Sequence, residues 1–205
     1  MIPALEALTL LREGNRRFVA SQSAIDSTTH QQRRAALVDK QEPFAIVLGC
    51  SDSRVPSELV FDQGFGDLFV IRVAGNIVAP SQVGSVEFAA VRFQTRLVVV
   101  MGHTQCGAIM AAMEEILGRS APESQNLRSI VDRVRPSMEK LFRDGATKDV
   151  NDLIQESVRA NVRASADHLR HGSPLLEQLI REQGLLVVGA EYSLQSGVVT
   201  FFDGV

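Results

Sequence analysis

Two short segments of this 205-residue chain carry side chains that can bind a metal ion. They are Gly49-Cys50-Ser51-Asp52-Ser53-Arg54 and Gly102-His103-Thr104-Gln105-Cys106-Gly107, and they contain both cysteines of the chain. Two thiolates and one imidazole are a good ligand set for zinc, and His-x-x-Cys is a usual spacing. Cys50, His103 and Cys106 would leave one tetrahedral position for water, as in catalytic zinc sites. Either cysteine alone is more simply a buried structural thiol, so the prediction depends on the two segments meeting.

Asp52 and Arg54 add a charged pair beside the predicted metal. Residues two apart in an extended or turn segment project to the same side, so these two can pair. The guanidinium would hold Asp52 ionised and lower the pKa of its carboxyl group. An ionised Asp52 could accept a hydrogen bond from hydroxide on the zinc, because bound water there has a pKa of roughly 7. A purely structural ion pair is the alternative interpretation.

The surrounding sequence predicts an α/β fold that brings both motifs to one edge of a sheet. Short apolar runs, which are typical of buried parallel strands, precede both motifs. Strands that alternate with helices indicate a parallel sheet covered on both faces, with ligand sites at the carboxyl ends of the strands. The predicted strands are 44–48, 68–71, 97–101 and 185–188, with a short antiparallel strand within 197–202; the predicted helices are 3–20, 31–40, 83–93 and most of 106–182.

A helix that begins near Cys106 would place its partly positive N-terminus by the sulfur and favour the thiolate. We predict a single domain over residues 1–205, with a mainly parallel four-stranded sheet, flanking helices and the C-terminal strand. Residues 1–40 are predicted to form a helical arm that can pack on a partner subunit rather than on its own sheet.

Composition excludes several classes of protein. Hydrophobic residues make up 45% and charged residues 22% of the chain, as in ordinary globular proteins. The net charge is −3 and there is no long run of Lys or Arg, so we expect no nucleic-acid partner and no anionic membrane. The apolar runs are far shorter than the roughly 20 residues that span a bilayer. With no signal-peptide pattern and two cysteines, we expect a cytoplasmic protein with free thiols.

The two motifs together resemble those of the β-class carbonic anhydrases. The combination is highly specific, and the likeness extends from Glu13-Gly14-Asn15-Arg16-Arg17-Phe18 to Val188-Gly189-Ala190-Glu191-Tyr192. The resemblance implies a homodimer, or a dimer of dimers, that interconverts carbon dioxide and bicarbonate. It implies one Zn²⁺ per chain on Cys50, His103 and Cys106, with Asp52 and Arg54 as the catalytic dyad. It also implies a closed state in which Asp52 is the fourth zinc ligand, and we expect higher pH to favour hydroxide at that position.

The same resemblance assigns substrate-binding roles. The residues concerned are Gln41, which would reach across the dimer interface, Phe69, Ala74 and Phe88 in an apolar carbon dioxide pocket, and Gly107, whose amide could bond the substrate anion. Ala74 stands where Val is frequent and Phe88 where Tyr is common, so this chain keeps an apolar side chain at both positions but lacks that Tyr hydroxyl. One subgroup of the family binds inhibitory bicarbonate through a Trp. This chain has no Trp and has Val47 at the matching position, so we expect the non-allosteric form.

Two other functions fit the same residues. The first is hydrolysis of carbonyl sulfide or carbon disulfide on the same zinc scaffold, which would differ in the shape of the pocket. The second is a non-catalytic interaction module stabilised by zinc, in which Asp52 would be a permanent fourth ligand. Arg54 argues against the second function, because a structural tetrahedron does not require it.

Overall fold

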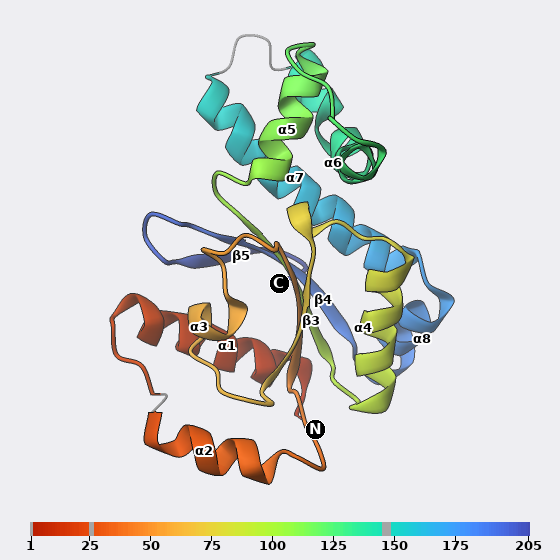
Figure 1. Ribbon diagram of the computed structural model, residues 1–205. Coiled ribbons are helices and arrows are strands. Elements are labelled where there is room, and N and C mark those ends of the chain that lie inside the picture. The colour runs from red at the N-terminus through yellow and green to blue at the C-terminus, as the bar shows by residue number, and fades with distance from the viewer. Residues whose placement is uncertain (1, 25–26, 145–148) are drawn as a thin grey trace.

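The computed structural model describes residues 2–24, 27–144 and 149–205, which form an α/β domain around a five-stranded sheet (Figure 1). The strands are β1 (Ala45–Gly49), β2 (Leu68–Arg72), β3 (Leu97–His103), β4 (Leu186–Tyr192) and β5 (Val199–Asp203), in the order β2-β1-β3-β4-β5. The first four are parallel and β5 is antiparallel to β4. The predicted architecture, four parallel strands and an antiparallel C-terminal strand, is confirmed.

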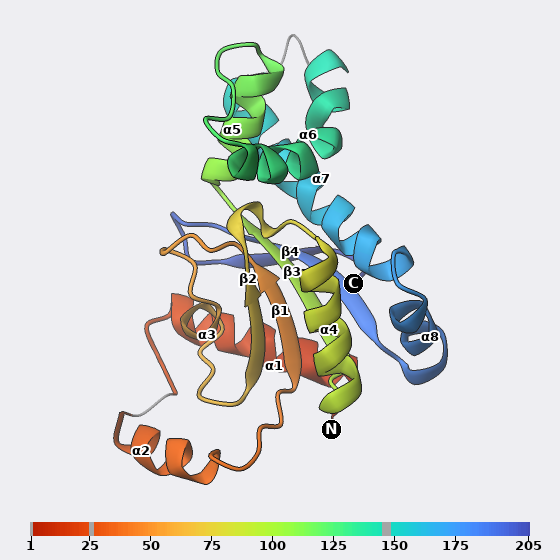
Figure 2. The same ribbon diagram turned by 45° about the vertical axis from the view of Figure 1, so that its right-hand side comes forward.

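Helices cover both faces of the sheet (Figure 2). On one face lie α1 (Ala4–Val19) and the short α3 (Ser57–Val60), and on the other α4 (Pro80–Arg92), α7 (Val150–His171) and α8 (Pro174–Gln183). Every residue of β1 and β3 is buried, because alternate side chains of each strand enter two different cores. In β3, for example, Val99 packs in the core beneath α1 and Val98 in the core beneath α4, α7 and α8.

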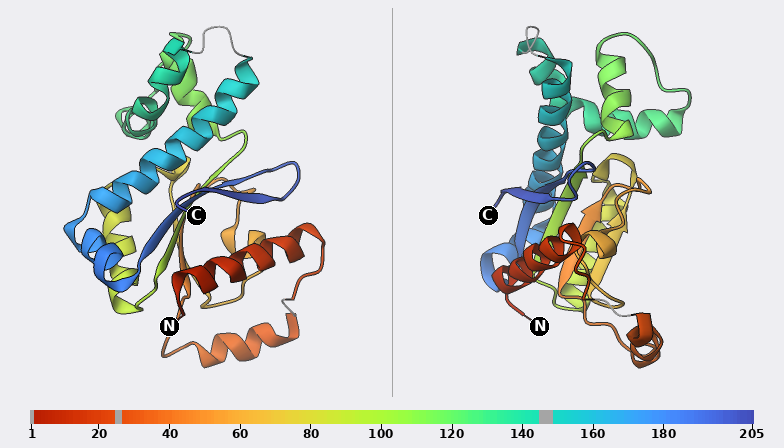
Figure 3. Two further views of the ribbon diagram at one scale, coloured as in Figure 1. Left: turned by 180° about the vertical axis from the view of Figure 1, so that it is seen from behind. Right: turned by 90° about the vertical axis from the view of Figure 1, so that its left-hand side faces the viewer.

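A third group of helices stands beyond the carboxyl ends of the strands. It consists of α5 (Gly107–Ile116), α6 (Gln125–Asp144) and the first half of α7, and the views from opposite sides show it clear of the sheet (Figures 1 and 3). The 3₁₀ turn η1 (Ala74–Asn76) lies below it. These elements enclose a third apolar cluster that includes Cys50, Cys106, Ile109 and Met138. Both cysteines are therefore buried where the helical group meets the sheet.

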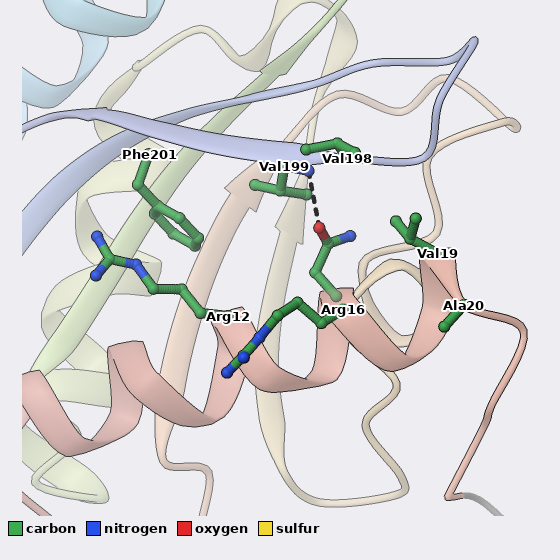
Figure 4. Close-up of a pocket in the computed structure, with 8 residues that line it drawn as sticks. Arg12, Arg16, Val19, Ala20, Val198, Val199 and Phe201 are labelled. Atoms are coloured by element: carbon green, nitrogen blue, oxygen red, sulfur yellow. Dashed lines mark hydrogen bonds between the residues drawn. The ribbon is translucent and has the colours of Figure 1, made fainter.

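The α1 helix packs on the sheet of its own chain, which differs from the expectation that the arm packs on a partner. The Asn15 side chain donates to Val60 O at 3.0 Å and accepts from the Val199 amide at 2.9 Å. Figure 4 shows this junction, where a cavity of about 490 Å³ lies between α1 and β5 and Arg12 stacks over the Phe201 ring. Asn15 thus ties the helix to the chain segments on both sides of it.

The segment after α1 is held by a buried carboxylate. Asp62 accepts hydrogen bonds from Arg17 Nε at 2.6 Å, Ser23 Oγ at 2.6 Å and the Ala24 amide at 3.0 Å. Burial acts to raise the pKa of Asp62, but these hydrogen bonds and the Arg17 charge outweigh it and lower that pKa. Beyond the next residues, α2 (Ser27–Ala36) lies apart from the sheet and contacts the 64–67 loop through Arg33 (Figure 1).

Two strands extend further than their apolar runs. We predicted that β3 ends at Met101, but it continues to His103, which pairs with Tyr192 of β4. β4 itself continues to Tyr192 because it pairs with β3 on one side and with β5 on the other. Residues beyond the apolar runs join these strands because they pair with neighbouring strands. An apolar pattern in the sequence cannot predict such pairing. Among the described residues, no helix is both long enough and apolar enough to span a bilayer.

Candidate metal centre and active site

Cys50, His103 and Cys106 meet at the carboxyl edge of the sheet. Cys50 follows the last residue of β1, His103 is the last residue of the neighbouring strand β3, and Cys106 is the N-cap of α5. Their ligand atoms all lie within 4.8 Å of one another, and the exposed fractions of the three residues are 5%, 0% and 1%. Two neighbouring parallel strands and one helix start therefore place a Cys-His-Cys cluster in a buried position.

The imidazole of His103 is oriented toward this cluster. Its Nδ1 lies 2.9 Å from the Thr104 carbonyl oxygen, and since that oxygen can only accept, Nδ1 carries the proton. Nε2 is then unprotonated and carries a free lone pair. It is buried and, within the described part of the chain, has no hydrogen-bond partner. A buried nitrogen acceptor without a donor is costly unless it binds something. This unpaired nitrogen and the two sulfurs fit a divalent metal such as zinc. A histidine that binds a metal through one ring nitrogen usually donates a hydrogen bond to a carbonyl from the other, as His103 does here.

The two thiols share a proton between them. The pKa of Cys50 is lowered, first because the Cys106 thiol donates to its sulfur and also through the amides of Asp52 and Gly75, against the opposing effect of burial. The pKa of Cys106 is raised, because it donates that hydrogen bond and is buried beside a thiolate. The amides at the start of α5 act in the expected direction, toward the thiolate, but are outweighed. A metal cation between the sulfurs would displace this proton. Both cysteines would then be thiolates, and their two negative charges would balance a divalent ion.

Asp52 and Arg54 form the predicted pair beside the cluster. Arg54 donates to Asp52 from Nε at 2.9 Å, from Nη2 at 2.7 Å and from its backbone amide at 2.9 Å. The Arg54 guanidinium is the main reason that the pKa of Asp52 lies well below its usual range. Asp52 Oδ2 is 3.8 Å from His103 Nε2, so an ionised carboxylate faces the ligand cluster on one side and the guanidinium on the other.

The loop that carries Cys50 and Asp52 is fixed by Arg72, at the end of β2. Arg72 donates from Nε to Cys50 O at 3.1 Å and from Nη2 to Asp52 O at 2.7 Å. Our sequence analysis did not identify this residue. Its position at the end of a third strand of the same edge was the available signal, because the two motifs already marked that edge.

Comparison with known proteins decides the family. The family model described as carbonic anhydrase matches residues 45–199. Carbonic anhydrase 2 of Mycobacterium tuberculosis (strain CDC 1551 / Oshkosh) is 37% identical over 195 residues, which cover 94% of this chain and 90% of that protein. A carbonic anhydrase of Mycolicibacterium smegmatis is 36% identical over 189 residues, or 92% of this chain and 88% of that protein. The chain belongs to the β-carbonic anhydrase family. It is an enzyme of that family, whose general reaction is hydration of carbon dioxide.

Solved structures agree with this β-carbonic anhydrase fold. The β-carbonic anhydrase CcaA superposes with a TM-score of 0.75 at 26% identity and covers 97% of this chain and 89% of that chain. CafA of Aspergillus fumigatus gives a TM-score of 0.77 at 24% identity, over 97% of this chain and 91% of that one.

The substrate-site residues assigned by resemblance fall into two groups in this β-carbonic anhydrase. Ala74 and Gly107 line a cavity of about 440 Å³ between α5 and α6, next to the turn and helix start that hold Cys50 and Cys106. Its other lining residues include Ala108, Ala111 and Ile130, so the walls are largely small and apolar. Ala74 and Gly107 are thus close in sequence to the Gly75 amide and to Cys106, although the cavity itself is lined by none of the three candidate ligands.

Phe69, Phe88 and Gln41 lie elsewhere in the same chain. The rings of Phe69 and Phe88 are 6.2 Å apart and both pack against Phe93, on the α4 face of the sheet. Phe69 pairs with Ile46, four residues before Cys50, which places it roughly 13 Å away along β1. Gln41 is exposed in the extended segment that leads into β1. Within a single chain these three residues are not brought to the metal cluster.

Proposed function

We propose that this chain is a zinc-dependent carbonic anhydrase that interconverts carbon dioxide with bicarbonate and a proton. Cys50, His103 and Cys106 would hold the zinc, with Asp52 and Arg54 as the catalytic dyad. The observation that carries the proposal is the buried Cys-His-Cys cluster, with its orphaned Nε2, directly beside a carboxylate that Arg54 keeps ionised. When bound, zinc supplies a Lewis acid that makes water nucleophilic at neutral pH.

The chain's own groups would orient and shield the reaction. Ionised Asp52 accepts a hydrogen bond from the attacking water and fixes its direction, because the bidentate contact with Arg54 holds the carboxylate in place. The Gly107 amide, at the N-terminus of α5, would donate to the anionic product. Ala74 and the small side chains beside it, Ala108 and Ala111, would offer carbon dioxide an apolar surface. The Arg54–Asp52 pairing supports the open arrangement, in which Asp52 is not a zinc ligand.

We propose that the working unit is a homodimer or a dimer of dimers. In this arrangement a second copy brings Gln41, and with it Phe69 and Phe88, to each metal centre. Support comes from the large apolar side chains exposed along the β2 edge of the sheet, among them Leu59 (61%), Phe65 (51%) and Phe88 (54%). The solved β-carbonic anhydrases of Sordaria macrospora are described as tetrameric. Because the two thiols need a reducing compartment to stay free, we place the enzyme in the cytoplasm.

Zinc content and carbon dioxide hydration, measured on one purified sample, test the proposal. We expect one zinc per chain together with hydration activity, and Asp52→Asn should retain the zinc but lose the activity. If the sample hydrolyses carbonyl sulfide or carbon disulfide in preference to hydrating carbon dioxide, the protein is instead a hydrolase of those substrates. Stoichiometric zinc without turnover of any of these substrates would instead identify a non-catalytic module.

A further inference from the structure

The turn η1 lies directly against the sulfur of Cys50. The Gly75 amide donates to Cys50 Sγ at 3.4 Å. Gly75 has φ 70° and Asn76 has φ 43°, so two successive residues occupy the left-handed region. This conformation is uncommon for a residue with a side chain, and it persists where the surroundings hold it in place. The position of the Gly75 amide therefore depends on contacts from other parts of the fold.

Helix α7 supplies these contacts from far along the sequence. Asn161 Nδ2 donates to Gly75 O at 2.8 Å, and Ser165 Oγ donates to Asn76 O at 3.1 Å. The two side chains are one helical turn apart on the same face, and the exposed fractions of the residues are 2% and 5%. The two carbonyl groups of the turn are thus held by two buried donors on one rigid helix.

The same helix is packed tightly against the strand that carries His103. A Cβ atom at Gly102 would lie 2.7 Å from Val162 Cγ2 and 3.1 Å from Val158 Cγ1, so α7 approaches β3 as closely as the missing side chain allows. Asn161 lies between these two valines in sequence. Its amide is therefore fixed relative to β3 and, through η1, relative to Cys50.

We propose that Asn161 is a positioning residue of the metal centre, which acts on Cys50 through the Gly75 amide. By binding Gly75 O it keeps the N–H of the same residue aimed at the sulfur. A hydrogen bond to a ligating thiolate draws electron density from it and fixes its direction, and such outer contacts tune metal affinity. This inference rests on the proposed zinc site and names a residue that neither motif contains.

The test compares Asn161→Ala with a matched change on the same helix. Ser157 is also buried, but its hydroxyl donates to Leu153 O of its own helix at 2.6 Å. Ser157→Ala thus controls for the loss of a buried polar group from α7. Ser165→Ala is a milder second variant, because it removes only the bond to Asn76 O and leaves the one to Gly75 O.

Two measurements separate positioning from a merely structural role. In Asn161→Ala we expect zinc to bind about 10- to 100-fold more weakly in a chelator competition. In cobalt-substituted protein, the thiolate-to-metal charge-transfer band should move to longer wavelength, because a thiolate without its hydrogen bond donates more readily. Ser165→Ala should move both quantities in the same direction by less, and Ser157→Ala should move neither.

The inference is overturned if Asn161→Ala changes the band and the zinc affinity no more than Ser157→Ala does. If Asn161→Ala does not fold, the Ser165→Ala and Ser157→Ala pair decides the question by the same comparison. Wild-type protein that binds no zinc and no cobalt would contradict the proposed function itself, which is a different outcome from wild-type binding with no effect of the variants.

Discussion

Alanine substitutions at three glycines can separate backbone strain from steric clash in the turn beside Cys50. Gly75 has φ 70°, and a Cβ there would lie 2.9 Å from Ala108 Cβ and 3.3 Å from Val134 Cγ2. Gly118 has φ 67° with open space around it, and Gly84 lies within α4 with open space and no positive φ. Replacing each by Ala therefore adds backbone strain and a clash at Gly75, strain alone at Gly118, and neither at Gly84.

The expected magnitudes follow from these surroundings. A left-handed residue with a side chain costs about 1–2 kcal/mol, and overpacking a core costs about 1–3 kcal/mol more. Gly75→Ala should thus lower the free energy of unfolding by about 2–5 kcal/mol and Gly118→Ala by about 1–2 kcal/mol. Gly84→Ala should raise it by about 0.5–1 kcal/mol, because Ala is the better helix former. For a chain of this size, each kcal/mol shifts Tm by about 2–4 °C.

Thermal and urea unfolding of the three variants are the assay, with zinc affinity measured in parallel. Only Gly75→Ala should also weaken zinc binding, because it displaces the amide that contacts Cys50 Sγ. The reasoning is refuted if Gly75→Ala is no more destabilising than Gly118→Ala, or if its zinc affinity equals that of the wild type.

Three further predictions address the dyad, acid stability and α1. Arg54→Gln should keep zinc bound but reduce hydration by about 100-fold or more, since Asp52 loses its partner; wild-type turnover would contradict this. Because the pKa of Asp62 is lowered, its contribution to stability is present above about pH 4 and is lost as the pH falls through the lowered value. Unfolding between pH 2 and 5 should therefore show a steeper loss in wild type than in Asp62→Asn, and parallel curves would argue against this contribution. Leu11→Ala should cost about 2–5 kcal/mol in urea unfolding, because Leu11 is fully buried beneath the sheet; a negligible loss would mean that α1 does not pack there.

The sequence was sufficient to predict the sheet and the meeting of Cys50, His103 and Cys106, because both depend on local patterns. Apolar runs at 44–48 and 97–101 mark β1 and β3, and each leads into a motif at the carboxyl end of a strand. Parallel neighbours necessarily bring those ends together, so Cys50, His103 and Cys106 could be expected to meet before their positions were known.

The supporting contacts could not be predicted, because they join residues that are distant in sequence and ordinary in type. Asn161 and Gly75 are 86 positions apart, and an Asn on a mostly apolar helix face gives no sign of its partner. Arg72 could be placed at the functional edge by its position at a strand end, but its two acceptors are backbone carbonyls, which no sequence pattern identifies. The packing of α1 on its own sheet is similar, since its apolar face would suit a partner's sheet equally well.

Zinc K-edge X-ray absorption of the purified enzyme tests the central claim most directly. We predict stoichiometric zinc with two sulfur neighbours at about 2.3 Å and two nitrogen or oxygen neighbours at about 2.0–2.1 Å, as two thiolates, one imidazole and one oxygen require. Protein without stoichiometric zinc, or zinc whose first coordination sphere contains no sulfur, would contradict the account.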